Sequence, residues 1–281
     1  MWEKEKQHLI EPSPKIEKRK LGDLMTTNHK NNTYTMQSLT KAIHVLKAFT
    51  RKDKTLSLTQ LHNKTGIGIS SLQRIVATLI NEGFLHKDEK TKTYELGLSI
   101  FILGNLVEQE SGLITVAKPI LANLNHETGE SISLNIIDGD ERRCLLNLES
   151  THSLSTKAYV GDSAPLFAGA SAKTLLAFLS HEEIEQYLNK VRLVRITPKT
   201  ITNKQSVLES LAEIREKGYA ISKSERILGV ASISAPILLP TGKPLASITI
   251  VIPEVRFSQY NLEELIQKIK EAAHRIEQQL Y

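Results

Sequence analysis

The segment from Ser57 to Leu96 constrains the fold of this chain more than any other. It reads SLTQLHNKTGIGISSLQRIVATLINEGFLHKDEKTKTYEL. The spacing of its apolar residues predicts a short helix over 59–65, a turn at Gly66, a longer amphipathic helix and two strands around a basic turn. This succession is typical of a winged helix-turn-helix, whose second helix enters the major groove of DNA. The alternative is the same fold used only for protein contacts.

The longer helix separates an apolar side from a polar side. Ser70 as N-cap and Gln73 on the same turn predict a capping box, and Gly83 ends the helix. The residues predicted to face the core are Leu72, Ile75, Val76, Leu79 and Ile80. On the polar side, Arg74 can bond guanine or a phosphate. Gln73 either bonds adenine or stays occupied by its own helix end.

Positive charge is concentrated on residues 37–96, which include the predicted winged helix. Residues 37–96 hold ten Lys and Arg against five acidic residues, whereas residues 97–281 hold nineteen against twenty-one. Most of the net charge of +5 therefore falls on the predicted winged helix, which indicates double-stranded DNA as its partner. The wing lysines suit phosphate contacts, and a solvated hairpin tip is their alternative role. The predicted DNA-contacting residues are Thr59, Ser70, Ser71, Gln73, Arg74, Thr78, Lys87, Lys90 and Lys92.

The chain divides into four predicted parts. Residues 1–36 are polar and are expected to form a disordered arm, within which Met1, Met25 or Met36 could be the start codon. Residues 37–96 form the DNA-binding domain, which begins with a helix capped by Ser38. The buried face of that helix is predicted to be Leu39, Ala42, Ile43, Leu46 and Phe49. Residues 97–111 form a linker helix, and residues 112–281 form an effector-binding domain.

The second half alternates between strand and helix patterns, which indicates an α+β domain around a mostly antiparallel sheet. Strands are predicted at 131–137, 144–148, 155–160, 219–222, 231–238 and 245–252. Helices are predicted at 113–128, at 175–188 with a break and a capping box at Ser180, at 203–217 and from Asn261 onward. The linker helix has more apolar residues than one domain can cover, so a dimer contact is expected nearby.

Several classes of protein have no support. No apolar run approaches the roughly 18 residues of a membrane span and no secretory signal opens the chain, so a cytoplasmic location and no membrane partner are expected. The single cysteine, Cys144, leaves no internal disulfide and no cysteine cluster for zinc. The nine histidines show no metal-binding spacing. Neither a metal nor a cofactor is predicted.

Several motifs in order resemble the IclR family of bacterial transcriptional regulators. They are SLTKAIHVLKAF at 38–49, SLTQL at 57–61, TGIGISSLQRIVATLINEGFL at 65–85, YELG at 94–97, APLFAGASAKTLLAFL at 164–179, GYAISKSERILGVASISAPI at 218–237 and PLASITI at 244–250. The resemblance spans Ser38 to about Leu280. It implies a dimer or dimer of dimers on operator DNA and a GAF-like C-terminal domain that binds a small, often carboxylate-bearing effector.

The resemblance also implies where the effector binds. The implied positions are Ala164, Pro165, Leu166, Gly169, Ala170, Ser171, Ser222, Val230, Ser232, Thr249 and Val251. A helix N-terminus built of small residues exposes N–H groups that attract an anion, and nearby hydroxyls can fix its oxygens. The chain departs from the family pattern at Ile69, Ala172, Ser222 and Ser232. Ordinary strand and cap roles are the alternative for the serines and the threonine.

The leading functional hypothesis is a ligand-responsive repressor of a catabolic operon, with a small organic acid or sugar acid as effector. An activator of the same family is the first alternative. The second is an enzyme that acts on a small metabolite, in which Cys144 would be the nucleophile and His152 its base. A strand cysteine is more often a small core residue, which disfavours the enzyme.

Overall fold

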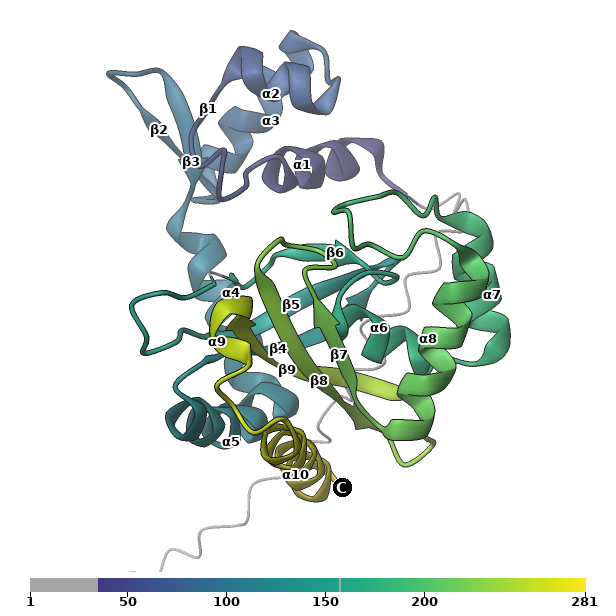
Figure 1. Ribbon diagram of the computed structural model, residues 1–281. Coiled ribbons are helices and arrows are strands. Elements are labelled where there is room, and N and C mark those ends of the chain that lie inside the picture. Colours follow the sequence, from purple (N-terminus) through teal and green to yellow (C-terminus); the bar gives the residue numbers. More distant parts are fainter. Residues whose placement is uncertain (1–34, 157) are drawn as a thin grey trace, which may run out of the picture.

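The computed structural model describes residues 35–156 and 158–281. All but the last two residues of the predicted arm, 1–36, lie outside the described residues. Figure 1 shows a small N-terminal unit, a connecting helix and a larger unit built on one sheet. Among the described residues no single helix is long and apolar enough to cross a membrane. Helices α4 (Leu98–Glu110) and α5 (Gly112–Thr128) pass that test only as a pair, and they are bent by 80°.

The N-terminal unit is a winged helix-turn-helix. Its elements are α1 (Gln37–Lys47), β1 (Leu56–Ser57), α2 (Leu58–Thr65), α3 (Ile69–Asn81), β2 (Leu85–Asp88) and β3 (Thr93–Leu96). The strands form an antiparallel sheet in the order β1-β3-β2, with Leu85 opposite Leu96. Val45, Leu61, Leu72 and Val76 form its buried core.

The helix caps differ from those predicted. Ser57 Oγ accepts the Gln60 N–H at 3.3 Å and Gln60 Oε1 accepts the Ser57 N–H at 2.8 Å, so the capping box is on α2. Helix α3 begins at Ile69 after an N-cap at Gly68, and the predicted box of Ser70 and Gln73 is wrong. Gly66 ends α2 in the left-handed conformation and Ile67 is buried directly after it. The chain therefore re-enters a helix before it reaches Ser70.

Helix α1 also departs from prediction. It begins at Gln37 after Met36, so Ser38 is not its cap. Within the predicted apolar face, Leu39 is 58% exposed and Ile43 is 42% exposed, whereas Val45 is completely buried. The helix packs on α2 and α3 through the Val45 side, because that side meets the core formed by those helices. An apolar strip of α1 is left on the surface.

The larger unit confirms the predicted α+β class. Its strands form one antiparallel sheet in the order β6-β5-β4-β9-β8-β7. The strands are β4 (Ser131–Asp138), β5 (Glu141–Leu148), β6 (Ser163–Pro165), β7 (Ala220–Lys223), β8 (Val230–Leu238) and β9 (Pro244–Pro253). The further helices are α6 (Ala170–Ala177), α7 (His181–Lys190), α8 (Lys204–Lys217), α9 (Glu254–Phe257) and α10 (Leu262–Leu280). The predicted caps at Ser180 and Asn261 are confirmed, and Asn203 caps α8.

The predicted strand at 155–160 is wrong. In the described residues of that stretch the chain is irregular, and the edge of β5 is taken by the residues that follow. The Cys144 N–H donates to Asp162 O, the Gly161 N–H donates to Cys144 O, and β6 then pairs with β5. These bonds take the edge of β5 from Glu141 to Cys144, and the described residues of 149–162 form no strand. Sequence patterns also did not predict the short elements β6 and α9.

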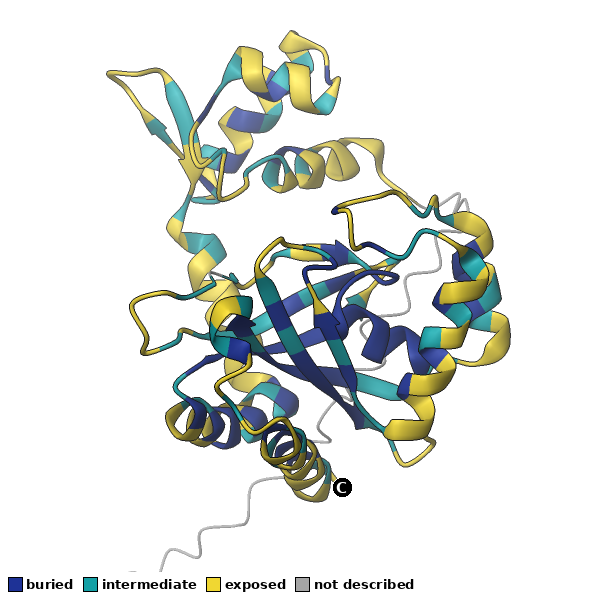
Figure 2. Ribbon diagram, viewed as in Figure 1, coloured by how far each residue is buried: buried dark blue, intermediate teal, exposed yellow. Residues whose placement is uncertain are grey.

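The two faces of the sheet differ in chemistry. Alternate residues of the central strands, such as Ile132, Ile233 and Ile248, are buried on the face that packs against α5 and α10. Many of the intervening residues have hydroxyl or amide side chains, including Ser133 and Thr249, and this face lies towards α6. Figure 2 shows how fully the central strands are buried between the helical layers. The fold thus places a polar surface inside the molecule.

Candidate DNA interface and effector cavity

The polar side of α3 is available to a partner. Gln73, Arg74 and Thr78 are exposed, Ser70 is exposed at the helix start, and Ser71 is half-buried. Thr59 is exposed on α2. Thr78 Oγ1 donates to the Arg74 carbonyl at 3.0 Å, whereas no hydrogen bond within the described residues occupies the Gln73 or Arg74 side chain. The alternative role of Gln73, capping its own helix, is therefore wrong.

The wing lysines are not equivalent. Lys87 Nζ and Lys92 Nζ each lie 2.8 Å from a carboxylate oxygen of Glu89. These two ammonium groups hold the pKa of Glu89 at about 2, so the carboxylate is charged at neutral pH. Lys90 uses its backbone N–H to bond Asp88 at 2.8 Å, and its side chain has no ion-pair partner within the described residues. Lys90 is thus the wing cation best placed to meet a phosphate.

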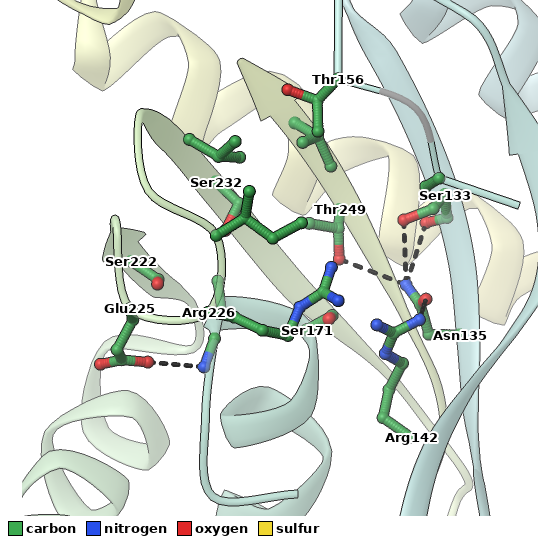
Figure 3. Close-up of a pocket in the computed structure, with 16 residues that line it drawn as sticks. Ser133, Asn135, Arg142, Thr156, Ser171, Ser222, Glu225, Arg226, Ser232 and Thr249 are labelled. Carbon is green, nitrogen blue, oxygen red and sulfur yellow. Dashed lines mark hydrogen bonds between the residues drawn. The ribbon is translucent and has the colours of Figure 1, made fainter. Parts of the chain in front are cut away.

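The larger unit contains a partly open cavity of about 50 Å³ on the polar face of the sheet. Figure 3 shows the lining side chains, which come from β4, β5, β7, β8, β9, the start of α6 and two loops. A water needs about 10–15 Å³ of such space, so the cavity has room for about four waters. That size fits a small metabolite rather than a peptide or nucleotide.

Most of the positions implied by the family resemblance reach this cavity. Those that line it are Gly169, Ala170, Ser171, Ser222, Val230, Ser232, Thr249 and Val251. Ala164, Pro165 and Leu166 are not among the lining residues, because Ala164 and Pro165 pair with β5 and Leu166 is buried in the core beneath α6. The lining residues that sequence reasoning missed are Ser133, Asn135, Arg142, Thr156, Ala158, Glu225, Arg226 and Ile227.

A chain of hydrogen bonds orders the floor of the cavity. Asn135 Nδ2 donates to Ser133 Oγ at 3.1 Å and to Thr249 Oγ1 at 3.4 Å. Thr249 Oγ1 in turn donates to Ser234 Oγ at 3.0 Å. Asn135 Oδ1 accepts from Arg142 Nη1 at 3.2 Å. Because each amide atom of Asn135 has a buried partner, its orientation and that of the Arg142 guanidinium are fixed together.

The backbone N–H at the start of α6 is already bonded to the carboxylate of Glu225 from the same chain. The Gly169 N–H donates to Glu225 Oε2 at 2.5 Å, and Lys173 Nζ donates to Glu225 Oε1 at 2.6 Å. The side chains of Lys173 and Glu225 are only 4% and 7% exposed. The expectation that this helix start offers its N–H groups to an external anion is therefore wrong for Gly169.

Two arginines reach the cavity without a carboxylate partner among the described residues. Arg142 is 4% exposed, and its Nε is buried with no hydrogen-bond partner. No hydrogen bond within the described residues engages Arg226. Burial, followed by repulsion from Arg226, lowers the pKa of Arg142 to about 10, and burial also lowers the pKa of Arg226. The Asp162 carboxylate offsets part of this effect on both.

The predicted nucleophile and base do not form a pair. Burial raises the pKa of Cys144 to about 11, so the thiol is protonated at neutral pH, and it donates to the Leu146 carbonyl at 3.3 Å. His152 Nε2 instead lies 3.5 Å from the Tyr260 hydroxyl and 4.0 Å from Glu130. A nucleophilic cysteine needs a lowered pKa and a nearby base, so this arrangement does not suit covalent catalysis.

An exposed recognition helix in one unit and a polar cavity in the other are the parts of a DNA-binding regulator with an effector domain. The chain matches the IclR helix-turn-helix domain over residues 38–89 and the C-terminal domain of the bacterial transcriptional regulator IclR over residues 106–278. It belongs to the IclR family of bacterial transcriptional regulators.

Individual relatives agree with this assignment. The chain is 33% identical over 244 residues to the HTH-type transcriptional regulator KipR of Bacillus subtilis, covering 87% of this chain and 97% of that protein. It is 26% identical to the transcriptional repressor IclR of Escherichia coli, covering 86% and 89%. A crystal structure of an IclR homolog with 4-hydroxybenzoate from Microbacterium hydrocarbonoxydans shares the fold, with 23% identity, a TM-score of 0.76 and coverage of 86% and 98%. The curated relatives are transcriptional regulators, not enzymes.

Proposed function

We propose that this protein is a cytoplasmic repressor of a catabolic operon whose affinity for operator DNA is set by a small organic acid. One observation supports this most: a single chain combines an exposed polar row on α3 with a polar cavity that two arginines reach without a carboxylate partner among the described residues. The Escherichia coli relative is named a transcriptional repressor, which favours repression over activation. Raised expression of the neighbouring operon on deletion of the gene supports repression, whereas lowered expression indicates an activator.

The proposed functional parts are residues 37–96 for DNA binding, 97–111 for the linker helix and 112–281 for the effector. Within the first part, Arg74 reads a base and Lys90 neutralises a phosphate. Removal of a base-reading arginine costs about 1–3 kcal/mol of binding free energy, whereas removal of phosphate contacts lowers the salt dependence of binding. Fluorescence anisotropy with operator duplex tests this for Arg74→Ala and for a Lys87/Lys90/Lys92→Ala variant.

Exposed Arg195, on the effector unit, supplies a matched control. Arg195→Ala removes the same charge as Arg74→Ala but lies outside the winged helix, so its binding should equal that of the wild type. Undiminished operator affinity in both the Arg74 variant and the wing variant would reject the DNA-binding role assigned to these residues.

We further propose that the protein binds DNA as a dimer or a dimer of dimers. Helix α4 has no buried residue, and Leu98, Phe101 and Val107 are 70%, 70% and 63% exposed. Together with the exposed strip of α1, this surface is too apolar for a chain that remains alone in water. A second copy covers it and brings two recognition helices to two half-sites. Sedimentation equilibrium at micromolar concentration tests this, and a monomer contradicts it.

The described part of the loop between β5 and β6 contacts both the cavity and the N-terminal unit. Its Thr156 and Ala158 line the cavity, and the neighbouring Tyr159 ring lies under the Arg51 guanidinium at 3.1 Å. Arg51 belongs to the N-terminal unit, between α1 and β1. We propose that effector binding rearranges this loop and thereby changes the contact between Tyr159 and Arg51, which passes the signal to the winged helix.

A further inference from the structure

The charges that face the cavity do not balance. Glu225 is already paired with Lys173 and with the start of α6. The other described acidic group in this region is Asp162, which is half-buried and uses its carboxylate to accept the Tyr159 N–H at 3.1 Å. Arg142, which is buried, and Arg226, which is half-buried, therefore face the cavity with one half-buried carboxylate near them. Buried charges without a partner are unfavourable, and two like charges in one cavity are more so.

The two arginines come from opposite sides of the cavity. Arg142 is on β5 and is held from below by Asn135 and by the Asp162 carbonyl, at 3.2 and 3.3 Å. Arg226 is on the loop between β7 and β8. Figure 3 shows the two guanidinium groups extending towards each other, that of Arg226 below Thr249 and that of Arg142 beside Asn135. The buried Nε of Arg142 is a donor that still lacks an acceptor.

We propose, on the basis of the function proposed above, that the effector is a small dicarboxylate whose two carboxylate groups are bound by Arg142 and Arg226. A guanidinium presents parallel N–H donors that match the two oxygens of one carboxylate. A monocarboxylate would neutralise one arginine and leave the other without a carboxylate partner. Room for about four waters restricts the ligand to a short carbon chain. The hydroxyls of Ser133, Ser232 and Thr249 also line the cavity and suit a polar group on that chain.

Isothermal titration calorimetry without DNA tests the proposal. The probes are linear dicarboxylates of three to six carbons, each with the monocarboxylate of equal length, together with inorganic phosphate. We expect at least one dicarboxylate to bind the wild type at least tenfold more tightly than its matched monocarboxylate. Arg142→Gln and Arg226→Gln should each weaken that binding at least tenfold and abolish the preference for two charges. Arg195→Gln is the control and should change neither.

Thermal unfolding of the ligand-free variants separates a lost contact from a lost fold. Arg142→Gln removes a buried charge without a carboxylate partner, so its melting temperature should equal or exceed that of the wild type. A lower melting temperature contradicts the proposed excess of positive charge. Equal affinity for a dicarboxylate and its monocarboxylate, binding of phosphate alone, or no binding by any dicarboxylate would overturn the proposal.

An operator-binding measurement with the same ligands distinguishes this inference from the function on which it rests. If a dicarboxylate binds through both arginines but leaves DNA affinity unchanged, the inference stands and the regulatory function fails. If DNA affinity responds only to a singly charged acid, the regulatory function stands and the inference fails.

Discussion

The stability of the effector unit should be most sensitive to substitution at the buried ion pair of Lys173 and Glu225. Lys173→Met keeps the length of the side chain but removes its charge, and it leaves the Glu225 carboxylate buried with only the Gly169 N–H as a partner. Both side chains are more than nine-tenths buried, so solvent screens the interaction little. Loss of one partner from a buried ion pair costs about 3–5 kcal/mol of unfolding free energy. For a unit of this size, that lowers the melting temperature by about 6–20 °C.

Differential scanning calorimetry at fixed protein concentration measures the effect, because self-association would otherwise shift the transition. Lys173→Met/Glu225→Gln removes both charges and should recover most of the loss. Lys190→Met is a matched control: its partner is Asp140, both side chains are exposed, and the cost should be about 0–1 kcal/mol. A Lys173→Met variant that melts within about 2 °C of the wild type would refute the assigned role of the pair.

Three further predictions concern the wing, the cysteine and the loop. Glu89→Gln frees two lysines, so the slope of log affinity for DNA against log salt should steepen by up to about 0.9 per freed lysine; an unchanged slope counts against the wing contacts. Cys144 should resist thiol reagents until the pH rises through about 11, where the buried thiol deprotonates, and the urea-unfolded chain is the control; rapid reaction at pH near 8 contradicts its burial. Tyr159→Ala should weaken the effector's influence on DNA affinity while Tyr159→Phe, which keeps the ring under Arg51, retains it; equal responses exclude the contact as the coupling.

Local sequence patterns predicted helices and strands well where one face of the element packs on a core and capping residues mark its ends. Ser180 and Asn261 cap helices as expected because each precedes an apolar-patterned run. The cap signal at Ser70 was misleading because burial of Ile67 fixes the turn and starts α3 earlier. Competition between two plausible caps is decided by tertiary packing, which the local pattern does not contain.

The cavity was predicted only in part for a similar reason. The alternation of Ser131, Ser133 and Asn135 with isoleucine and leucine places polar side chains on one face of a buried strand, and this signal was available in the sequence. Arg142 is buried, whereas its neighbour Arg143 forms a partly exposed ion pair with Asp138. No local sequence signal indicates which of the two arginines is buried. The direction of a long side chain near a strand end depends on which elements pack over it.

The apolar surface of α1 illustrates a third limit. A pattern of apolar residues predicts that a face is covered, but it does not say whether the same chain or another copy covers it. Leu39 and Ile43 have the spacing of a core face and are nevertheless exposed in the single chain.

Operator binding with and without effector shows whether the cavity controls the winged helix. A duplex selected from random sequences by the wild-type protein can be titrated at fixed salt, with and without the tightest-binding dicarboxylate. We predict saturable binding that Arg74→Ala weakens by about 1–3 kcal/mol and a shift in affinity with the dicarboxylate that Arg142→Gln abolishes. Failure to select any duplex, or an affinity that no small acid changes, would contradict the account of this protein as an effector-controlled regulator of transcription.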